Sequence, residues 1–136
     1  MKRAVTIILP LLALGCRSPD LVQPFRGSFQ FAVTGTAPAT MGFQPAAAAA
    51  AGVERVTVTG SVATECGKVL SGRPGIHPRT RGLALELEEA LGPPCASGSG
   101  RVVHRFQADF GVEAGRHVVA VRHGTTSLGP FEVTVD

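Results

Sequence analysis

Four histidines are the side chains of this sequence best suited to bind a metal ion or to move a proton. They are His77, His104, His117 and His123. His117 and His123 fall on one face of an alternating run, but six residues of strand would separate them by about 20 Å. The C-x-x-C pair that accompanies histidines in a structural zinc site is absent. We therefore expect structural histidines, and neither a metal ion nor another cofactor.

The serines and acidic residues form no recognisable catalytic set. Ser97 and Ser99 lie in a Gly-rich run without the G-x-S-x-G pattern of a nucleophile elbow. Glu86, Glu88 and Glu89 could supply paired carboxylates, although a solvated strand face explains them more simply. No phosphate-binding or dinucleotide-binding motif is present in the sequence. We therefore predict no catalytic residues and no enzymatic activity.

A basic stretch from residue 67 to residue 82 carries four cations and no acidic residue. The cations are Lys68, Arg73, Arg79 and Arg81. They could contact anionic lipid headgroups, lipopolysaccharide or an acidic partner. A solvated loop without a role is the other interpretation, because basic surface loops are common.

These side chains must be positioned by β-strands, because the C-terminal quarter alternates apolar and polar residues with the period of a half-buried strand. The three alternating runs are residues 102–110, 117–123 and 131–135. We predict that the last two form a hairpin in which His123 lies opposite Phe131. The same register would place Val119 opposite Val135. The connecting GTTSLGP is predicted to be a loop, with Pro130 at the start or the edge of its strand.

The connection between the first two runs, residues 110–121, reads FGVEAGRHVVAV. It resembles the corner of bacterial immunoglobulin-like and fibronectin-type sandwiches, where an apolar residue, a small-Gly turn and an aromatic residue precede a strand. Val112, Ala114-Gly115 and His117 fill these positions. Such a corner usually carries a Tyr whose hydroxyl binds nearby backbone, so His117 departs from the pattern. The resemblance implies an all-β fold, a small immunoglobulin-like antiparallel β-sandwich, with His117 hydrogen-bonded to nearby backbone.

The chain before this quarter divides into further strands and loops. Residues 29–33 and 53–63 alternate as strands do, and a short strand at 68–70 lies inside a loop from residue 64 to residue 82. Residues 36–52 are low in complexity, with two Pro and six consecutive Ala. Because a helix of six alanines is marginal alone, we predict a long surface loop there.

Residues 83–91, LALELEEAL, fit two kinds of secondary structure. Every residue is a good helix former, yet the leucines at the start alternate as in a strand. We choose strand for residues 83–88, because the neighbouring segments are strand-rich and tertiary context overrides propensity.

The N-terminus has the parts of an export signal: basic Met1-Lys2-Arg3, an apolar run at residues 4–15, and small residues before Cys16. The predicted signal-peptide helix has about 12 apolar residues, fewer than the roughly 20 that span a bilayer. The ending Leu12-Ala13-Leu14-Gly15-Cys16 resembles the lipobox of bacterial lipoproteins, with Ala13 where that family more often has Leu. The resemblance implies cleavage before Cys16 and a lipid on its thiol. Ordinary secretory cleavage after Gly15 is the alternative.

The other two cysteines form an even pair once Cys16 is assigned to lipid. In an oxidising compartment we expect Cys66 and Cys95 to form a disulfide. Closing a loop of about 30 residues would stabilise the fold by roughly 3.6 kcal/mol in the chain-entropy model. A metal site is the alternative, although His77, which lies between the two cysteines, supplies no recognisable ligand spacing.

These features divide the chain into a signal peptide, residues 1–15, a lipid-anchored tether, residues 16–27, and a β-sandwich domain, residues 28–136. We expect a non-enzymatic cell-envelope lipoprotein that acts as an interaction or structural module. It would bind the membrane through its N-terminal lipid and could also bind another envelope protein. Arg17 is not the Asp that resembles an inner-membrane retention signal, so we expect the outer membrane, facing the periplasm or the cell surface.

The charge of the mature chain argues against nucleic acid as a partner. The whole sequence carries +3, but removal of Lys2 and Arg3 leaves 11 basic against 10 acidic residues.

A secreted sandwich that inhibits proteases is the first alternative function, on fold analogy alone. A small-ligand-binding or enzymatic envelope protein is the second, and a deep cleft lined by His104 or His117 would support it.

Overall fold

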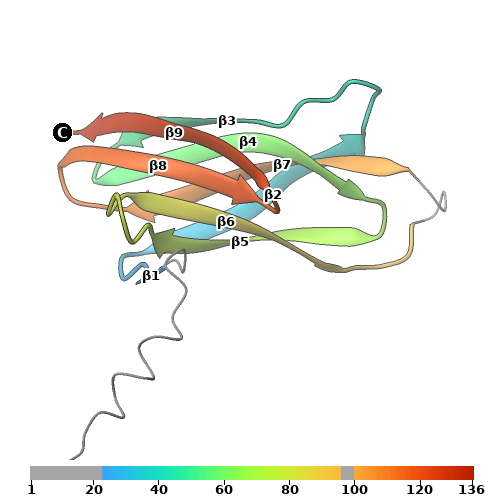
Figure 1. Cartoon of the computed structure of the whole chain (residues 1–136), viewed down its shortest axis with the longest axis horizontal. Helices are drawn as coiled ribbons and strands as arrows, with labels where there is room; N and C mark the ends of the chain where they lie inside the picture. Colours follow the sequence, from blue (N-terminus) through green and yellow to red (C-terminus); the bar gives the residue numbers. More distant parts are fainter. Residues whose placement is uncertain (1–22, 96–99) are drawn as a thin grey trace, which may run out of the picture.

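The computed structural model describes residues 23–95 and 100–136, and the regular structure of these residues consists of nine β-strands. The strands are β1 (Gln23–Pro24), β2 (Phe29–Pro38), β3 (Ala46–Gly52), β4 (Arg55–Glu65), β5 (Lys68–Ile76), β6 (Leu83–Leu91), β7 (Arg101–Gly111), β8 (Gly115–His123) and β9 (Thr126–Val135). Figure 1 shows them as two layers elongated along the strands. The predicted all-β fold is confirmed, whereas the predicted signal-peptide helix lies outside the described residues.

Two sheets pack face to face as a sandwich. One sheet has five strands in the order β1-β5-β6-β8-β9, and the other has four in the order β2-β7-β4-β3. Two edge strands from different sheets, β3 and β9, lie side by side, and β2 lies close to β5 at the opposite edge (Figure 1). The apolar interior is therefore enclosed between the two sheets.

The pairing of β6 with β8 is parallel, whereas the other six pairings of the described strands are antiparallel. The prediction of a wholly antiparallel sandwich is therefore wrong at this position. The cause is the path of the chain: β7 leaves for the other sheet, and β8 returns beside β6. Because β7 reverses the direction of β6, and β8 reverses the direction of β7, β6 and β8 run the same way.

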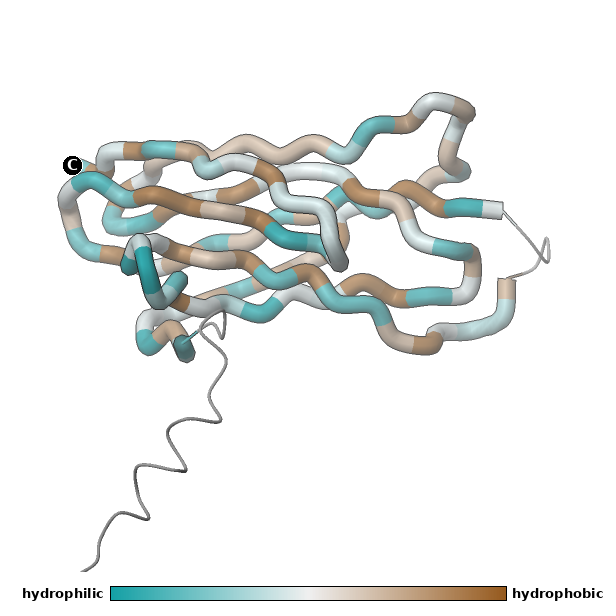
Figure 2. Tube along the Cα trace, viewed as in Figure 1, coloured by the Kyte–Doolittle hydropathy of each residue, from teal (hydrophilic) through white to brown (hydrophobic). Residues whose placement is uncertain are grey.

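The core comes from the inward side chains of both sheets. Val56 and Val58 of β4, Leu85 of β6 and Phe106 and Phe110 of β7 are all at most 2% exposed. Figure 2 shows hydrophobic and hydrophilic residues alternating along the strands, as a sandwich with one solvated face per sheet requires.

The six-alanine run forms a strand, which corrects the loop predicted for residues 36–52. The run pairs with β4 in an unbroken register from Ala46–Ser61 to Gly52–Arg55, and β2 extends to Pro38. Alternate methyl groups, those of Ala47 and Ala49, pack against the core. Backbone pairing and this packing outweigh the helical propensity of alanine, which leaves only residues 39–45 as the connection.

The basic stretch is also mainly strand, because β5 spans nine residues where three were predicted. The sequence did not predict the full strand because it contains Gly72, Pro74 and Gly75, and glycine and proline are uncommon inside strands. Neighbouring β1 pairs with β5 only at Gly75 and Ile76. Most of β5 is therefore a sheet edge, where proline is tolerated.

The strand prediction for residues 83–88 is confirmed, and β6 extends it to Leu91. The strand lies between β5 and β8. Its leucines at positions 83, 85 and 87 are at most 5% exposed, so burial at a period of two decides against the helix.

The β8–β9 hairpin forms, but with a different register from the one predicted. His123 lies opposite Thr126, so the loop is only Gly124-Thr125, and Gly124 adopts a positive φ of 62°. Val119 therefore faces Phe131. A two-residue turn with glycine first matches the strand twist better than the seven-residue loop we predicted. Pro130 lies on β9, an edge strand, as expected.

Candidate functional site

Of the residues predicted to form sites, Cys16 lies outside the described residues. The other two cysteines form the predicted disulfide, with the Cα atoms of Cys66 and Cys95 separated by 5.5 Å. The disulfide joins the turn between β4 and β5 to the segment after β6. It therefore ties together two connections, β4–β5 and β6–β7, that cross between the sheets at one end of the sandwich.

The structure does not bring the four predicted cations together. Lys68 opens β5 at the disulfide end, and Arg73 lies in the middle of that strand. The guanidinium of Arg73 stands 3.1 Å from the carboxylate of Glu88, with both side chains about half exposed. The stretch itself contains no acidic residue, but β6 supplies Glu88 as the neighbour of Arg73. Arg79 and Arg81 lie at the other end, in the loop that follows β5.

The loop at residues 77–82 is held by its own hydrogen bonds. The imidazole Nδ1 of His77 accepts bonds from the backbone N–H groups of Arg79, at 3.2 Å, and Thr80, at 3.4 Å. The backbone N–H of His77 donates to Gly82 O at 2.8 Å, and that of Arg81 donates to His77 O at 2.8 Å. Arg79 and Arg81 are therefore exposed on a loop of fixed shape.

This loop borders an open hollow of about 640 Å³ at the end of the sandwich where β1 lies. We call this end the β1 end and define it by residues 25–28, 77–82 and 112–114. Charged side chains at the hollow are Arg26, Arg81, Glu113 and Arg116, and apolar ones include Phe25, Ile76, Leu83 and Val118. No pattern in the sequence predicts this grouping, because Arg26 lies between β1 and β2, Arg81 between β5 and β6, and Arg116 at the start of β8, and only the fold brings them together.

His117 also lines the hollow, at the start of β8. Its Nε2–H donates to the backbone carbonyl of Glu113 at 2.8 Å. The predicted bond between His117 and nearby backbone is thus confirmed. The ring nitrogen is engaged across the corner, which fixes the chain where it enters β8.

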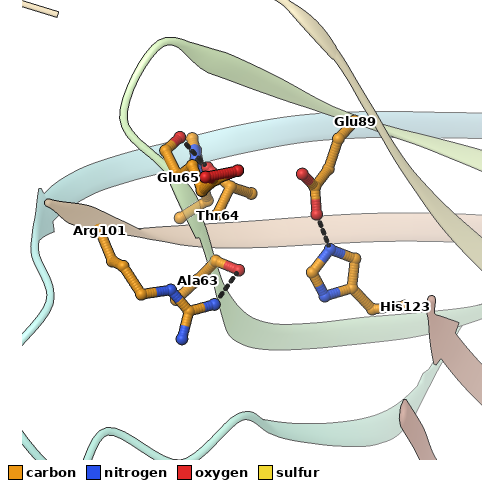
Figure 3. A network of polar contacts seen from close by, with 7 residues as sticks. Ala63, Thr64, Glu65, Glu89, Arg101 and His123 are labelled. Carbon is orange, nitrogen blue, oxygen red and sulfur yellow. Dashed lines mark hydrogen bonds and ion pairs between the residues drawn. The ribbon is translucent and has the colours of Figure 1, made fainter. Parts of the chain in front are cut away.

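A second polar cluster lies between the sheets toward the disulfide end. Thr64 of β4 and His104 of β7 are 1% and 5% exposed, and Thr64 Oγ1 stands 2.9 Å from His104 Nε2. Glu89 of β6 and His123 of β8 form a neighbouring pair, 2.6 Å from carboxylate oxygen to Nε2. Figure 3 shows this pair close to Thr64. His104 thus lies near the Glu89–His123 pair, and both members of the pair act electrostatically on its imidazole.

The hydrogen bonds assign the tautomer of His104. The Thr64 hydroxyl donates to Glu65 O at 2.9 Å, so it accepts from His104 Nε2–H. Nδ1 then carries a lone pair, and no group in the described residues donates to it. Burial lowers the pKa of His104 below its ordinary value of 6.5, and the Glu89 carboxylate opposes this shift. The His123 ring adds a smaller lowering effect to the pKa.

The cluster has the residue types of a hydroxyl–imidazole–carboxylate relay, but its contacts are distributed differently. A relay needs the carboxylate on the second nitrogen of the histidine that contacts the hydroxyl. Here Glu89 binds His123, while Thr64 binds His104. The Thr64 hydroxyl is also enclosed, so a substrate could not reach it without the sheets parting. The arrangement therefore serves packing between the sheets.

Residues 23–95 and 100–136 contain no group of three or more His, Cys, Asp or Glu side chains arranged to hold a metal ion. In the same part of the chain, no helix has the length and apolar character to cross a bilayer.

The sequence matches no protein-family model, and neither a curated protein nor a solved structure is similar to it.

Proposed function

We propose that this protein is an exported lipoprotein of the bacterial cell envelope, anchored through a lipid on Cys16. The observation that carries the proposal is the sequence Leu12-Ala13-Leu14-Gly15-Cys16, which follows a basic start and a short apolar run. The Cys66–Cys95 disulfide supports export, because such bonds persist in oxidising compartments. Arg17 after the cysteine favours the outer membrane.

The β-sandwich then acts as a non-enzymatic interaction or structural module that the lipid holds at the membrane. The enclosed Thr64 hydroxyl and the separate His104 and His123 contacts support this role over catalysis. The His117 corner supports an immunoglobulin-like class of sandwich, whereas the parallel β6–β8 pair departs from a simple antiparallel version. Open faces and loops would be available to another envelope protein.

Fractionation of a bacterial host that expresses the full chain tests the anchor. The parent protein should sediment with membranes and dissolve only in detergent. The Cys16→Ser variant should lose the lipid and move to the soluble or culture fraction, with its disulfide intact. A Ser18→Ala variant, which changes a neighbouring residue, should behave as the parent does. Equal partition of parent and Cys16→Ser proteins would overturn the proposal.

A further inference from the structure

We propose that the β1 end of the sandwich docks on the anionic headgroups of the membrane that holds the anchor. The contacts are Arg26, Arg79 and Arg81. The inference deepens the proposed function and rests on it for the identity of the membrane. It replaces the predicted set of four cations with one that the fold assembles.

The position of the anchor favours this end. The described chain begins at Gln23, in β1, and Cys16 lies seven residues earlier in the sequence. Seven residues can span at most about 25 Å when fully extended. A lipid on Cys16 therefore keeps β1 within about 25 Å of the headgroups, whereas the disulfide end can point away from them.

The three arginines are free to bind phosphate groups. Arg26, Arg79 and Arg81 are exposed, and no carboxylate of the described part of the chain lies within 4.0 Å of their guanidinium nitrogens. By contrast, Arg73 pairs with Glu88 at 3.1 Å, and Arg122 pairs with Glu86 at 3.1 Å. These two arginines on the flank of the five-stranded sheet thus have carboxylate partners, while Arg26, Arg79 and Arg81 have none in the described part of the chain.

The shape of the β1 end suits a headgroup. Arg26 and Arg81 stand at the open hollow of about 640 Å³, within the size range of small-molecule sites. The hydrogen bonds of His77 fix the loop that carries Arg79 and Arg81. Little conformational freedom of the backbone is therefore lost on contact.

Two further charged groups at the hollow modify the attraction. Arg116 lies 3.4 Å from Glu132, so it already has an anionic partner within the protein. Glu113 is exposed at the same hollow, and its carboxylate should repel an anionic surface. Binding should therefore weaken when the three arginines are removed and strengthen when Glu113 is neutralised.

Vesicle binding by the full chain carrying Cys16→Ser tests the inference without the lipid. Vesicles of about three parts phosphatidylglycerol to seven parts phosphatidylcholine are compared with phosphatidylcholine alone, at about 0.05 M and about 0.5 M salt. All proteins share the apolar N-terminal run, so its contribution cancels between variants. The matched control is Lys68→Gln/Arg73→Gln/Arg105→Gln, which removes equal charge away from the β1 end.

At low salt, Arg26→Gln/Arg79→Gln/Arg81→Gln should weaken binding to anionic vesicles by about fivefold per arginine, on the order of 100-fold together. The control triple should weaken binding much less, and Glu113→Gln should strengthen it by up to about fivefold. All differences should shrink at high salt.

Equal losses in the two triple variants would show an effect of net charge alone and overturn the docking surface. A difference between the two triple variants that is equally large on phosphatidylcholine alone would also overturn it. Neither result would decide whether Cys16 carries a lipid, which fractionation tests separately. Conversely, a free Cys16 would remove the anchor while leaving the vesicle result valid for the surface.

Discussion

The ring of Phe31 on β2 covers Gly72 on β5, so closely that a Cβ atom at residue 72 would stand 2.7 Å from ring atom Cε2. The same ring stacks on Phe106, with ring centroids 5.9 Å apart and an interplanar angle of 21°. Phe31 is thus held between the core and the opposite sheet. The absence of a side chain at Gly72 lets the two sheets approach at this edge.

Gly72→Ala should therefore lower the free energy of unfolding by about 1–3 kcal/mol, because the new methyl group displaces the Phe31 ring. Denaturant unfolding measures this loss. Gly35→Ala is the matched control, since a Cβ atom there meets nothing within 4 Å. In a Phe31→Leu background the same alanine should cost less. An equal cost in both backgrounds would contradict the contact.

Stability should fall in acid because of His104, whose pKa burial lowers below 6.5. The unfolded chain then binds a proton more readily than the folded one, so the contribution of His104 is complete above about pH 6.5 and is lost as the pH falls. Thermal unfolding of parent and His104→Gln proteins between about pH 7.5 and pH 5 tests this. The parent should lose more stability than the variant. Parallel pH profiles would contradict it.

Reduction of the Cys66–Cys95 disulfide should lower the free energy of unfolding by about 3.6 kcal/mol, because the unfolded chain regains the freedom of a loop of about 30 residues. Unfolding with and without reductant measures the change. A Cys66→Ala/Cys95→Ala protein should start from the lower stability and show no response to reductant. A parent unaffected by complete reduction would contradict the expected contribution.

Alternation identified the strands that bury one face, because side chains of β4, β7 and β8 reach the core at every second residue. It missed β3, whose six alanines show no contrast between faces. It also shortened β5, where Gly72 and Pro74 interrupt the apolar pattern. In both strands, pairing with a neighbour decides the structure, and pairing partners are distant in sequence.

The candidate site was less predictable than the fold. The Cys66–Cys95 disulfide could be predicted from the number of cysteines. The bond between His117 and the backbone could be predicted from the resemblance of its corner. The charged groups could not be assigned, because the partner of Arg73 comes from β6 and the neighbours of Arg81 come from other connections. The Thr64–His104 bond likewise depends on the register between β4 and β7, which places Val62 rather than Thr64 opposite His104.

The mass of the mature N-terminal peptide tests the lipid anchor most directly. After export in a bacterial host and proteolytic digestion, we expect a peptide that begins at Cys16 and carries a thioether-linked diacylglycerol. The Cys16→Ser protein should give no acylated peptide. An unmodified Cys16 thiol in the mature parent, or a mature N-terminus at another residue, would show that Cys16 carries no lipid anchor.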